Sequence, residues 1–265
     1  TLFDSDIKMF QNEYRLKNKN SSAILDFSFI DGYKSSLSNK TNSISHFFAE
    51  FDANLAWKNF TQSDLFLSYK RVSNDTYLKI FDSNIFKNKS TPKDYDVLNS
   101  EAQLILNNNK FNLVTGFQSF ESLNLASSDR YQFILPYYDF DRQLFSDLNN
   151  GTINFRSSGS NDLNNTNNLR TKIINDLNFQ SSNIISNNGF KNEYNLYLKN
   201  LNTVAKNDDL YKSSPQMELM SIIEFNTSLP LINQTDDEVN YFTPKISLRL
   251  NPGDMKDYSS SDRSI

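Results

Sequence analysis

The chain has 265 residues, of which 22% are charged and 14% aromatic, and its formal net charge is −4. This charge gives no basic surface for nucleic acid, and the absence of cysteine excludes disulfides and thiolate metal sites. No apolar run reaches the roughly 18 residues of a transmembrane helix, but a mean hydropathy of −0.60 still allows a transmembrane β-barrel, whose strands alternate apolar with polar residues.

Two β-hairpins are predicted in the first part of the chain. Residues 10–17 and 23–29 alternate apolar and polar side chains around a turn, and residues 44–55 and 65–70 repeat this pattern. The two strands of the second hairpin, which are separated by the break at 56–61 and end before 73, run to about ten residues or more. This is longer than the five to six typical of soluble sheets and close to the 9 to 11 that cross a bilayer. The pattern therefore predicts a sheet with one face toward lipid.

The two-residue period assigns side chains to the two faces of this sheet. The residues expected to face lipid are Phe47, Ala49, Phe51, Leu65, Leu67, Leu104, Leu106, Phe225 and Leu248. The residues expected to face a polar lumen are Glu50, Asp52, Glu101, Gln103, Glu224 and Arg249.

The same alternation predicts eight further strands and no helix. These strands cover residues 98–107, 111–117, 131–144, 152–157, 169–180, 190–199, 216–229 and 242–250. Asn108 and Asn109 suit a tight hairpin turn, because asparagine tolerates a positive φ. Pro136 removes a backbone donor and predicts a bulge or a strand start. The total is about twelve strands.

The lengths of the connections indicate an up-and-down barrel, in which turns are short on one side and loops are long on the other. Short connections are predicted at 18–21, 56–61, 108–109 and 146–150. Long connections are predicted at 31–43, 73–95, 122–130 and 201–215. The connection at 230–240 breaks this alternation.

The expected fold is all-β: an antiparallel, up-and-down transmembrane β-barrel, present as an incomplete barrel or curved open sheet. Residues 1–8 show no period and are interpreted as a lead-in. Residues 9–250 are the partial outer-membrane barrel, and residues 251–265 are a loop at which we interpret the chain as truncated.

No catalytic pattern stands out, and we predict no enzymatic role, no cofactor and no metal. His46 is the single histidine and has no partner recognisable in the sequence, so an ordinary strand-end residue explains it better than a Ser-His-Asp triad. Asp139 and Asp141 share one strand face, which a polar lumen wall explains better than paired acids. Residues 236–238 resemble a calcium cluster by composition only, because the glycine and spacing of an EF-hand are missing.

Several phrases of the chain resemble one protein family. They are QNEYRLKNKNSSAILDFSFI, DLFLSYKRVSNDTYLKIFDSNI, SSDRYQFILPYYDFD, NTSLPLI and YFTPKISLRLNPGDMKDYSSSD. In this order and at this spacing they resemble the lipopolysaccharide-assembly outer-membrane proteins of Gram-negative bacteria, LptD, also called organic-solvent-tolerance proteins. The phrases are structural and not catalytic, so the resemblance rests on their order over nearly the whole chain.

The resemblance implies a cell-outer-membrane barrel of about 26 strands that inserts lipopolysaccharide into the outer leaflet. It implies as partners lipopolysaccharide, membrane lipids, a plug lipoprotein inside the barrel, and periplasmic bridge proteins that dock on a jelly-roll domain. The family's jelly roll, its gate strands and about half of its barrel have no counterpart in this sequence. No gate or plug-contact residue is therefore assigned.

Two other classes fit the strand pattern alone. One is a different outer-membrane barrel, either a porin or a receptor-type transporter. The other is a soluble extracellular β-sandwich binding module, which needs a second sheet to cover its buried face.

Overall fold

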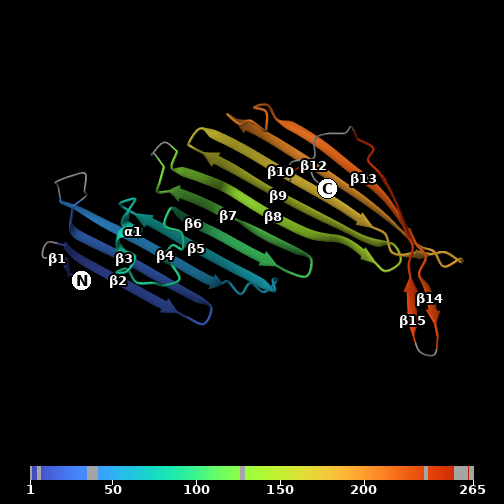
Figure 1. The fold of residues 1–265 in the computed structure, drawn as a ribbon, viewed down its shortest axis with the longest axis horizontal. Coiled ribbons are helices and arrows are strands. Elements are labelled where there is room, and N and C mark those ends of the chain that lie inside the picture. Colours follow the sequence, from blue (N-terminus) through green and yellow to red (C-terminus); the bar gives the residue numbers. More distant parts are fainter. Residues whose placement is uncertain are drawn as a thin grey trace.

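The protein is built on one large antiparallel sheet, seen in a computed structural model (Figure 1). The structure describes residues 2–4, 7–34, 41–125, 129–235, 238–253 and 262. The first half contains β1 (Leu2–Asp4), β2 (Ile7–Lys17), β3 (Ser21–Lys34), β4 (Thr41–Asn54), β5 (Gln62–Val72), the helix α1 (Tyr77–Phe81), β6 (Val97–Asn107) and β7 (Phe111–Ser122). The second half contains β8 (Tyr131–Asp147), β9 (Gly151–Asn164), β10 (Asn168–Gln180), β11 (Ile184–Ile185), β12 (Lys191–Lys206), β13 (Gln216–Ser228), β14 (Leu231–Gln234), β15 (Val239–Phe242) and β16 (Lys245–Leu250).

The strands follow one another across the sheet in an up-and-down order. The path runs from β1 through β10 to β12, β13 and β16, and β11 pairs with β12 beside it. Strands β14 and β15 form a separate two-stranded hairpin. Within the described residues β1 and β16 do not pair, so the sheet is open (Figure 1). The expected all-β, antiparallel, open architecture is confirmed, and its place in a membrane stays a prediction.

The strands are long, as their alternation predicts. β8 has 17 residues and β12 has 16, whereas strands of soluble sheets usually have about 3 to 10. The register between β7 and β8 shifts between Ile134 and Tyr137, so the bulge predicted at Pro136 is confirmed. Long, paired strands of this kind place side chains on two continuous faces.

Asparagine closes several of the hairpins. The Asn108 side-chain oxygen accepts hydrogen bonds from the amides of Lys110 and Phe111, at 2.7 and 2.9 Å. Between β9 and β10, Asn165 and Thr166 both adopt a positive φ, of 50° and 54°, as the primed turns of tight hairpins require. The connection between β9 and β10 is therefore short, where the predicted alternation of short and long connections requires a long one.

One helix forms where none was predicted. In α1, Tyr77, Leu78 and Phe81 are all buried, so the apolar side of its single turn faces the sheet. Five residues are too few to show a helical period in the sequence. An isolated helix of this length is unstable in water, so contacts with the sheet hold it in place.

Three predicted boundaries are wrong. The expected loop at 31–43 is shorter, because β3 continues to Lys34 and β4 begins at Thr41, and residues 35–40 lie outside the described residues. Part of the expected lead-in forms β1 and the start of β2. The expected last strand is split, because Phe242 belongs to the small β14–β15 hairpin and β16 begins only at Lys245. Pro244 lies between them and has no amide hydrogen to continue a ladder.

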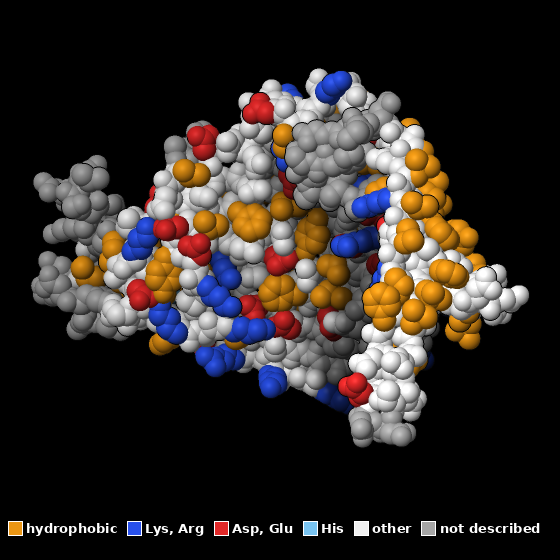
Figure 2. All heavy atoms as spheres, turned by 45° about the vertical axis from the view of Figure 1, so that its right-hand side comes forward, with side chains coloured by type: hydrophobic (Ala, Val, Ile, Leu, Met, Phe, Trp, Pro, Cys, Tyr) orange, Lys and Arg blue, Asp and Glu red, His pale blue; other side chains and the backbone are white. Residues whose placement is uncertain are grey.

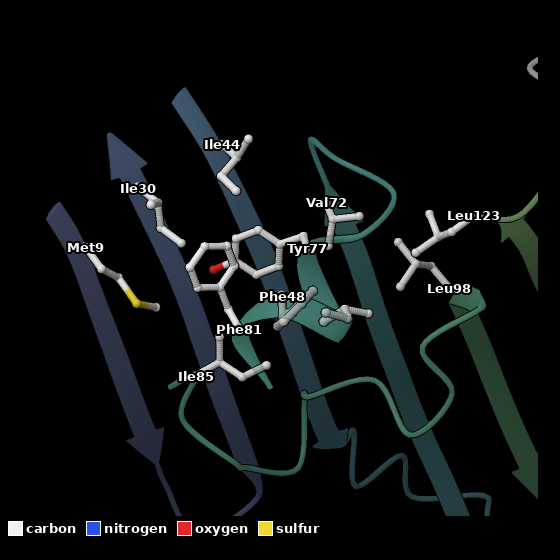
Figure 3. Close-up of a cluster of buried hydrophobic side chains, with 11 residues drawn as sticks. Met9, Ile30, Ile44, Phe48, Val72, Tyr77, Phe81, Ile85, Leu98 and Leu123 are labelled. Atoms are coloured by element: carbon white, nitrogen blue, oxygen red, sulfur yellow. The ribbon is translucent and has the colours of Figure 1, made fainter. Parts of the chain in front are cut away.

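A compact apolar core lies under α1, on one face of the first strands (Figure 3). Its side chains come from β2 to β6, from α1 and from the connections around it: Met9, Ile30, Ile44, Phe48, Val72, Tyr77, Leu78, Phe81, Ile85, Leu98 and Leu123. A smaller cluster joins Leu201, Ala205, Tyr211 and Met220 near the other edge. The connection between β5 and β6 therefore folds back onto the sheet.

Candidate functional site

One face of the sheet, which we call the apolar face, exposes hydrophobic side chains from its first strands to its last. Successive registers place on this face the exposed residues Phe10, Tyr14, Leu16, Leu25, Phe27, Phe29, Phe47, Leu67, Tyr69, Phe117, Ile173, Tyr194, Met217, Leu219, Ile223, Ile246, Leu248 and Leu250. Soluble monomers rarely expose an apolar area that extends over so many strands. An exposed apolar area of this extent is typical of a surface that binds a membrane or another protein.

All nine residues expected to face lipid lie on the apolar face. The register pairs Phe51 with Leu67, Leu65 with Leu104, and Phe225 with Leu248. Leu106 lies on the apolar face but is buried, with only 9% of its surface exposed. It lies beside Ser63, whose hydroxyl accepts a hydrogen bond from the Trp57 amide, so the β4–β5 connection folds over this end. Contact of the face with lipid stays a prediction.

Aromatic rings form a row at the end of the sheet where β4 turns into β5. Ring centroids are 5.9 Å apart for Trp57 and Phe60, 6.0 Å for Phe60 and Phe111, 5.7 Å for Phe111 and Phe140, and 6.3 Å for Phe140 and Phe155. The row crosses from the β4–β5 turn to β9. Aromatic girdles at one level are typical of barrels at a membrane–water interface.

The opposite face, which we call the polar face, carries hydrogen-bonded charges. Glu101 accepts hydrogen bonds from Gln118 at 2.7 Å and from the Tyr137 hydroxyl at 2.9 Å, and Gln103 donates to Tyr137. Figure 2 shows Lys, Arg, Asp and Glu side chains interspersed with hydrophobic ones over a hollowed face, while hydrophobic side chains line the outer side of one edge. This arrangement suits a wet surface.

The six residues expected to face a lumen all lie on the polar face. The register pairs Asp52 with Phe66, Gln103 also with Phe66, and Glu224 with Arg249. Glu50 is not open to the hollow as expected, because it is 7% exposed and its carboxylate lies 2.7 Å from the Lys89 ammonium. Their role in a lumen stays a prediction.

Ion pairs continue along the polar face toward the last strands. The Arg156 guanidinium donates to Asp139 across β8 and β9, at 3.2 Å from Nε. Lys172 donates to Asp262 at 2.7 Å, and the Tyr211 hydroxyl donates to the other oxygen of Asp262 at 2.6 Å. Asp139 is thus paired with an arginine and not with Asp141, as a polar wall predicts.

His46 lies at the centre of a buried polar network. Its Nε2 is 3.1 Å from Asp26 Oδ1, and its Nδ1 is 2.8 Å from the Tyr77 hydroxyl and 3.0 Å from the Ser28 hydroxyl. The Ser28 and Tyr77 hydroxyls also bond each other. Burial raises the pKa of Tyr77 to about 12, so its phenol stays neutral and able to donate. These partners of His46 were not recognisable in the sequence, and the residue lies within β4 and not at a strand end as expected.

This network has the order of an Asp-His-Ser triad, but it is closed. Asp26, Ser28, His46 and Tyr77 are all less than 4% exposed, and the Phe48 ring stacks on the imidazole at 4.3 Å. A nucleophile needs room for a reacting carbonyl beside it. In this conformation the network fastens α1 to β3 and β4, and the absence of enzymatic activity stays a prediction.

The connection between β5 and β6, which includes α1 and which we call the in-folded segment (residues 73–96), also binds the polar face beside this network. Asn88 donates to Glu13 at 2.7 Å and to Asp26 at 3.1 Å. Lys89 pairs with Asp52 at 2.6 Å as well as with Glu50. The sequence pattern missed these contacts, because their partners lie 37 to 75 residues apart.

Other expected or possible sites contribute no cluster. Among the described residues no group of three His, Cys, Asp or Glu side chains is placed to hold a metal ion. Asp236 and Asp237 lie outside the described residues, so the calcium-like composition at 236–238 stays unassigned. No helix in the described part of the chain is long and apolar enough to span a membrane.

Comparison with protein-family models gives no match, and a search of curated proteins gives none either. The functional proposal therefore depends on the two faces of the sheet and on the ordered phrases of the sequence.

Proposed function

We propose that this chain is part of an outer-membrane translocon that inserts lipopolysaccharide into the outer leaflet, in the manner of the LptD family. The observation that carries the proposal is the pairing of a continuous exposed apolar face with a charged face on one sheet of long, up-and-down strands. An outer-membrane barrel has this construction, with lipid outside and water inside.

The apolar face supports contact with membrane lipids. The residues Phe47, Leu67 and Leu248 are between 39 and 63% exposed, which costs free energy in water at about 25 cal/mol for each Å² of apolar surface. The row of rings from Trp57 to Phe155 suits an interface between hydrocarbon and water. Burial of these side chains in a bilayer removes this free-energy cost without a second layer of protein over the apolar face.

The polar face supports a wet lumen through which the saccharide part of lipopolysaccharide could pass. Its carboxylates are held in hydrogen bonds, as the Glu101, Gln118 and Tyr137 contacts illustrate. Such a wall stays hydrated without exposing unpaired charge to lipid. In this proposal a plug lipoprotein shares the lumen, and periplasmic bridge proteins deliver lipopolysaccharide through a jelly-roll domain.

The open edges of the sheet support membership of a larger barrel. Within the described residues, β16 pairs only with β13, and β1 pairs only with β2. In hydrocarbon each unsatisfied backbone group costs several kcal/mol, so a spanning sheet must close. Additional strands beside β1 and β16 meet this requirement, and a barrel of about 26 strands leaves room for them.

The proposal is tested by location and by depletion in the source bacterium. We expect the protein in the outer membrane, extracted only by detergent, and we expect depletion to stop newly made lipopolysaccharide from reaching the cell surface. Surface lipopolysaccharide can be measured by its access to an externally added modifying enzyme. Release of the protein into the aqueous fraction would support a soluble β-sandwich module. An outer-membrane location with unchanged surface lipopolysaccharide but impaired solute uptake would support a porin or receptor-type transporter.

A further inference from the structure

We propose that a cavity on the polar face binds an acidic saccharide unit, meaning a sugar that carries a carboxylate or a phosphate group. The cavity has a volume of about 500 Å³ and lies between strands β4 to β6 and the in-folded segment. Binding sites for small molecules typically measure about 300 to 1,000 Å³. The inference deepens the proposed function, since it rests on the polar face lining the lumen.

An unpartnered polar group belongs to one of the residues that line this cavity. The Asn99 side-chain oxygen lines it and is buried without a hydrogen-bond partner. A buried polar atom left unsatisfied costs about 1 to 3 kcal/mol, so native structures usually give it a partner. A ligand with hydroxyl groups would supply a partner to the Asn99 oxygen.

The charge of the cavity favours an anion. Lys70, Lys89 and Lys93 line it together with the carboxylates of Glu50 and Asp94. Lys89 is engaged by Glu50 and Asp52. Within the described part of the chain, Lys70 and Lys93 form no ion pair, so two ammonium groups remain available. Lysine ammonium groups bind carboxylate or phosphate oxygens through charge-assisted hydrogen bonds.

An apolar wall completes the site. Phe66 lines the cavity from β5, and Pro92 and Val97 line it from the other side. The face of a sugar ring carries C–H groups that pack against such a surface, whereas its edge carries hydroxyls. An acidic sugar can therefore contact all three features of the site: the ammonium groups, the unpartnered Asn99 oxygen and the ring of Phe66. A simple inorganic anion can contact only the ammonium groups.

Binding is measured by saturation-transfer NMR on the full chain in detergent micelles, with glucuronate as the probe. We expect glucuronate to bind, and we expect Lys70→Gln combined with Lys93→Gln to weaken binding at least about tenfold, which corresponds to one lost charge-assisted contact. Asn99→Leu should weaken binding by a similar factor. The matched control combines Lys58→Gln with Lys110→Gln, because these lysines line another cavity, of about 470 Å³. The control should bind as the unaltered chain does.

Two further probes separate the contributions. Glucose, which lacks the charge, and acetate, which lacks the sugar, should each bind more weakly than glucuronate. Purified lipopolysaccharide should compete with glucuronate if the ligand is lipid-linked, and a free acidic sugar is the ligand if it does not. Equal binding by the lysine variants and the control, or acetate binding as well as glucuronate, would overturn the site. Far-ultraviolet circular dichroism of each variant establishes that it is folded.

The outcomes for the site and for the proposed function are distinguishable. A protein that is extracted from the outer membrane and exports lipopolysaccharide, but gives no glucuronate signal, rejects the site alone. A protein that binds glucuronate through Lys70 and Lys93 but is released without detergent rejects the translocon alone.

Discussion

His46 Nε2 lies 3.1 Å from Asp26 Oδ1, and neither side chain has any exposed surface. The pair joins β3 to β4, and the Tyr77 hydroxyl at 2.8 Å from Nδ1 extends it to α1. An imidazole that donates from Nε2 to the carboxylate leaves Nδ1 free to accept from a hydroxyl. The histidine therefore connects the sheet to the in-folded segment.

Replacing His46 with alanine should loosen this connection. We expect the free energy of unfolding to fall by about 2 kcal/mol, because a buried carboxylate and a buried phenol each lose a partner. Limited proteolysis should then cleave the in-folded segment faster than in the unaltered chain. Tyr77→Phe keeps the ring in the apolar core and should have a smaller effect.

The same variant also tests the absence of catalysis. Lipopolysaccharide export should persist in His46→Ala at the level set by the remaining folded protein, since passage through a lumen makes and breaks no bond at this residue. Loss of export with unchanged barrel folding would contradict a purely structural role for His46.

The two faces of β4 should respond differently to a positive charge. Phe51→Arg places the guanidinium on the apolar face and should destabilise the folded protein by about 2 to 4 kcal/mol if it lies near the midplane of the bilayer. Asp52→Arg places it on the polar face and should cost much less. Denaturant titrations of the full chain folded into lipid vesicles compare the two, and equal effects would reject the assignment of lipid and lumen faces.

Gly116 allows a close approach between β6 and β7. A Cβ at this position would lie 2.2 Å from the carbonyl oxygen of Ala102 and 2.9 Å from the Tyr137 hydroxyl. Gly116→Ala should therefore destabilise the sheet by about 1 to 3 kcal/mol through overpacking. Gly253→Ala is the control, because its nearest contact is 3.5 Å away. Thermal unfolding of the two variants measures the difference, and a neutral Gly116→Ala would show that β6 and β7 can separate at little cost.

Asp208 should make the turn between β12 and β13 sensitive to acid. Burial acts to raise its pKa, but the Leu210 amide, the Arg170 side chain and the Tyr211 amide together hold the pKa below its ordinary value. The stabilisation is therefore present above the unfolded pKa of about 3.9. It is lost as the pH falls through the lower folded value.

Hydrogen exchange of the 207–212 amides as a function of pH measures this dependence. The unaltered chain should lose protection only as the pH falls below about 3.9, while Asp208→Asn should show weak protection at every pH. An acid-independent profile in the unaltered chain would contradict the role of Asp208.

The free edges of the sheet should drive association when residues 1–265 are produced alone. The unpaired backbone groups of β16, and of β13 where β16 does not cover it, can pair with another copy. Sedimentation in detergent should show dimers or larger species. Pro introduced at Ser247 should reduce association, since proline cannot donate to a new ladder. Monomers at all concentrations would show that the edges are protected.

The sequence predicted the face of the sheet on which a residue lies better than it predicted the residues that its side chain contacts. Phe51 and Leu67 share a face because side chains alternate along any strand, so a two-residue period is enough to assign them. The register that sets Asp52 opposite Phe66 depends on where each hairpin turns, and the predicted turn at 56–61 was close enough to place both strands. Local pattern and turn chemistry therefore account for most of the sheet.

The buried network and α1 could not be found in this way. Asp26 and Tyr77 lie 20 and 31 residues from His46, and no spacing links them before the sheet is paired. The helix is one turn long, so its apolar residues show no helical period in the sequence, and the segment was predicted as a loop. The cavity beside Lys70 likewise depends on the in-folded segment returning to the polar face.

The core beneath α1 leads us to expect an order of assembly in which the amino-terminal strands form first. Its side chains span only residues 9 to 123, and each strand from β2 to β7 pairs with its sequence neighbours. Contacts that are close in the chain cost little loop-closure entropy and form early. The amino-terminal strands thus hold a core of their own before the later hairpins are in place. The exposed side of β7 then offers a template to which β8 and its successors can be added one at a time.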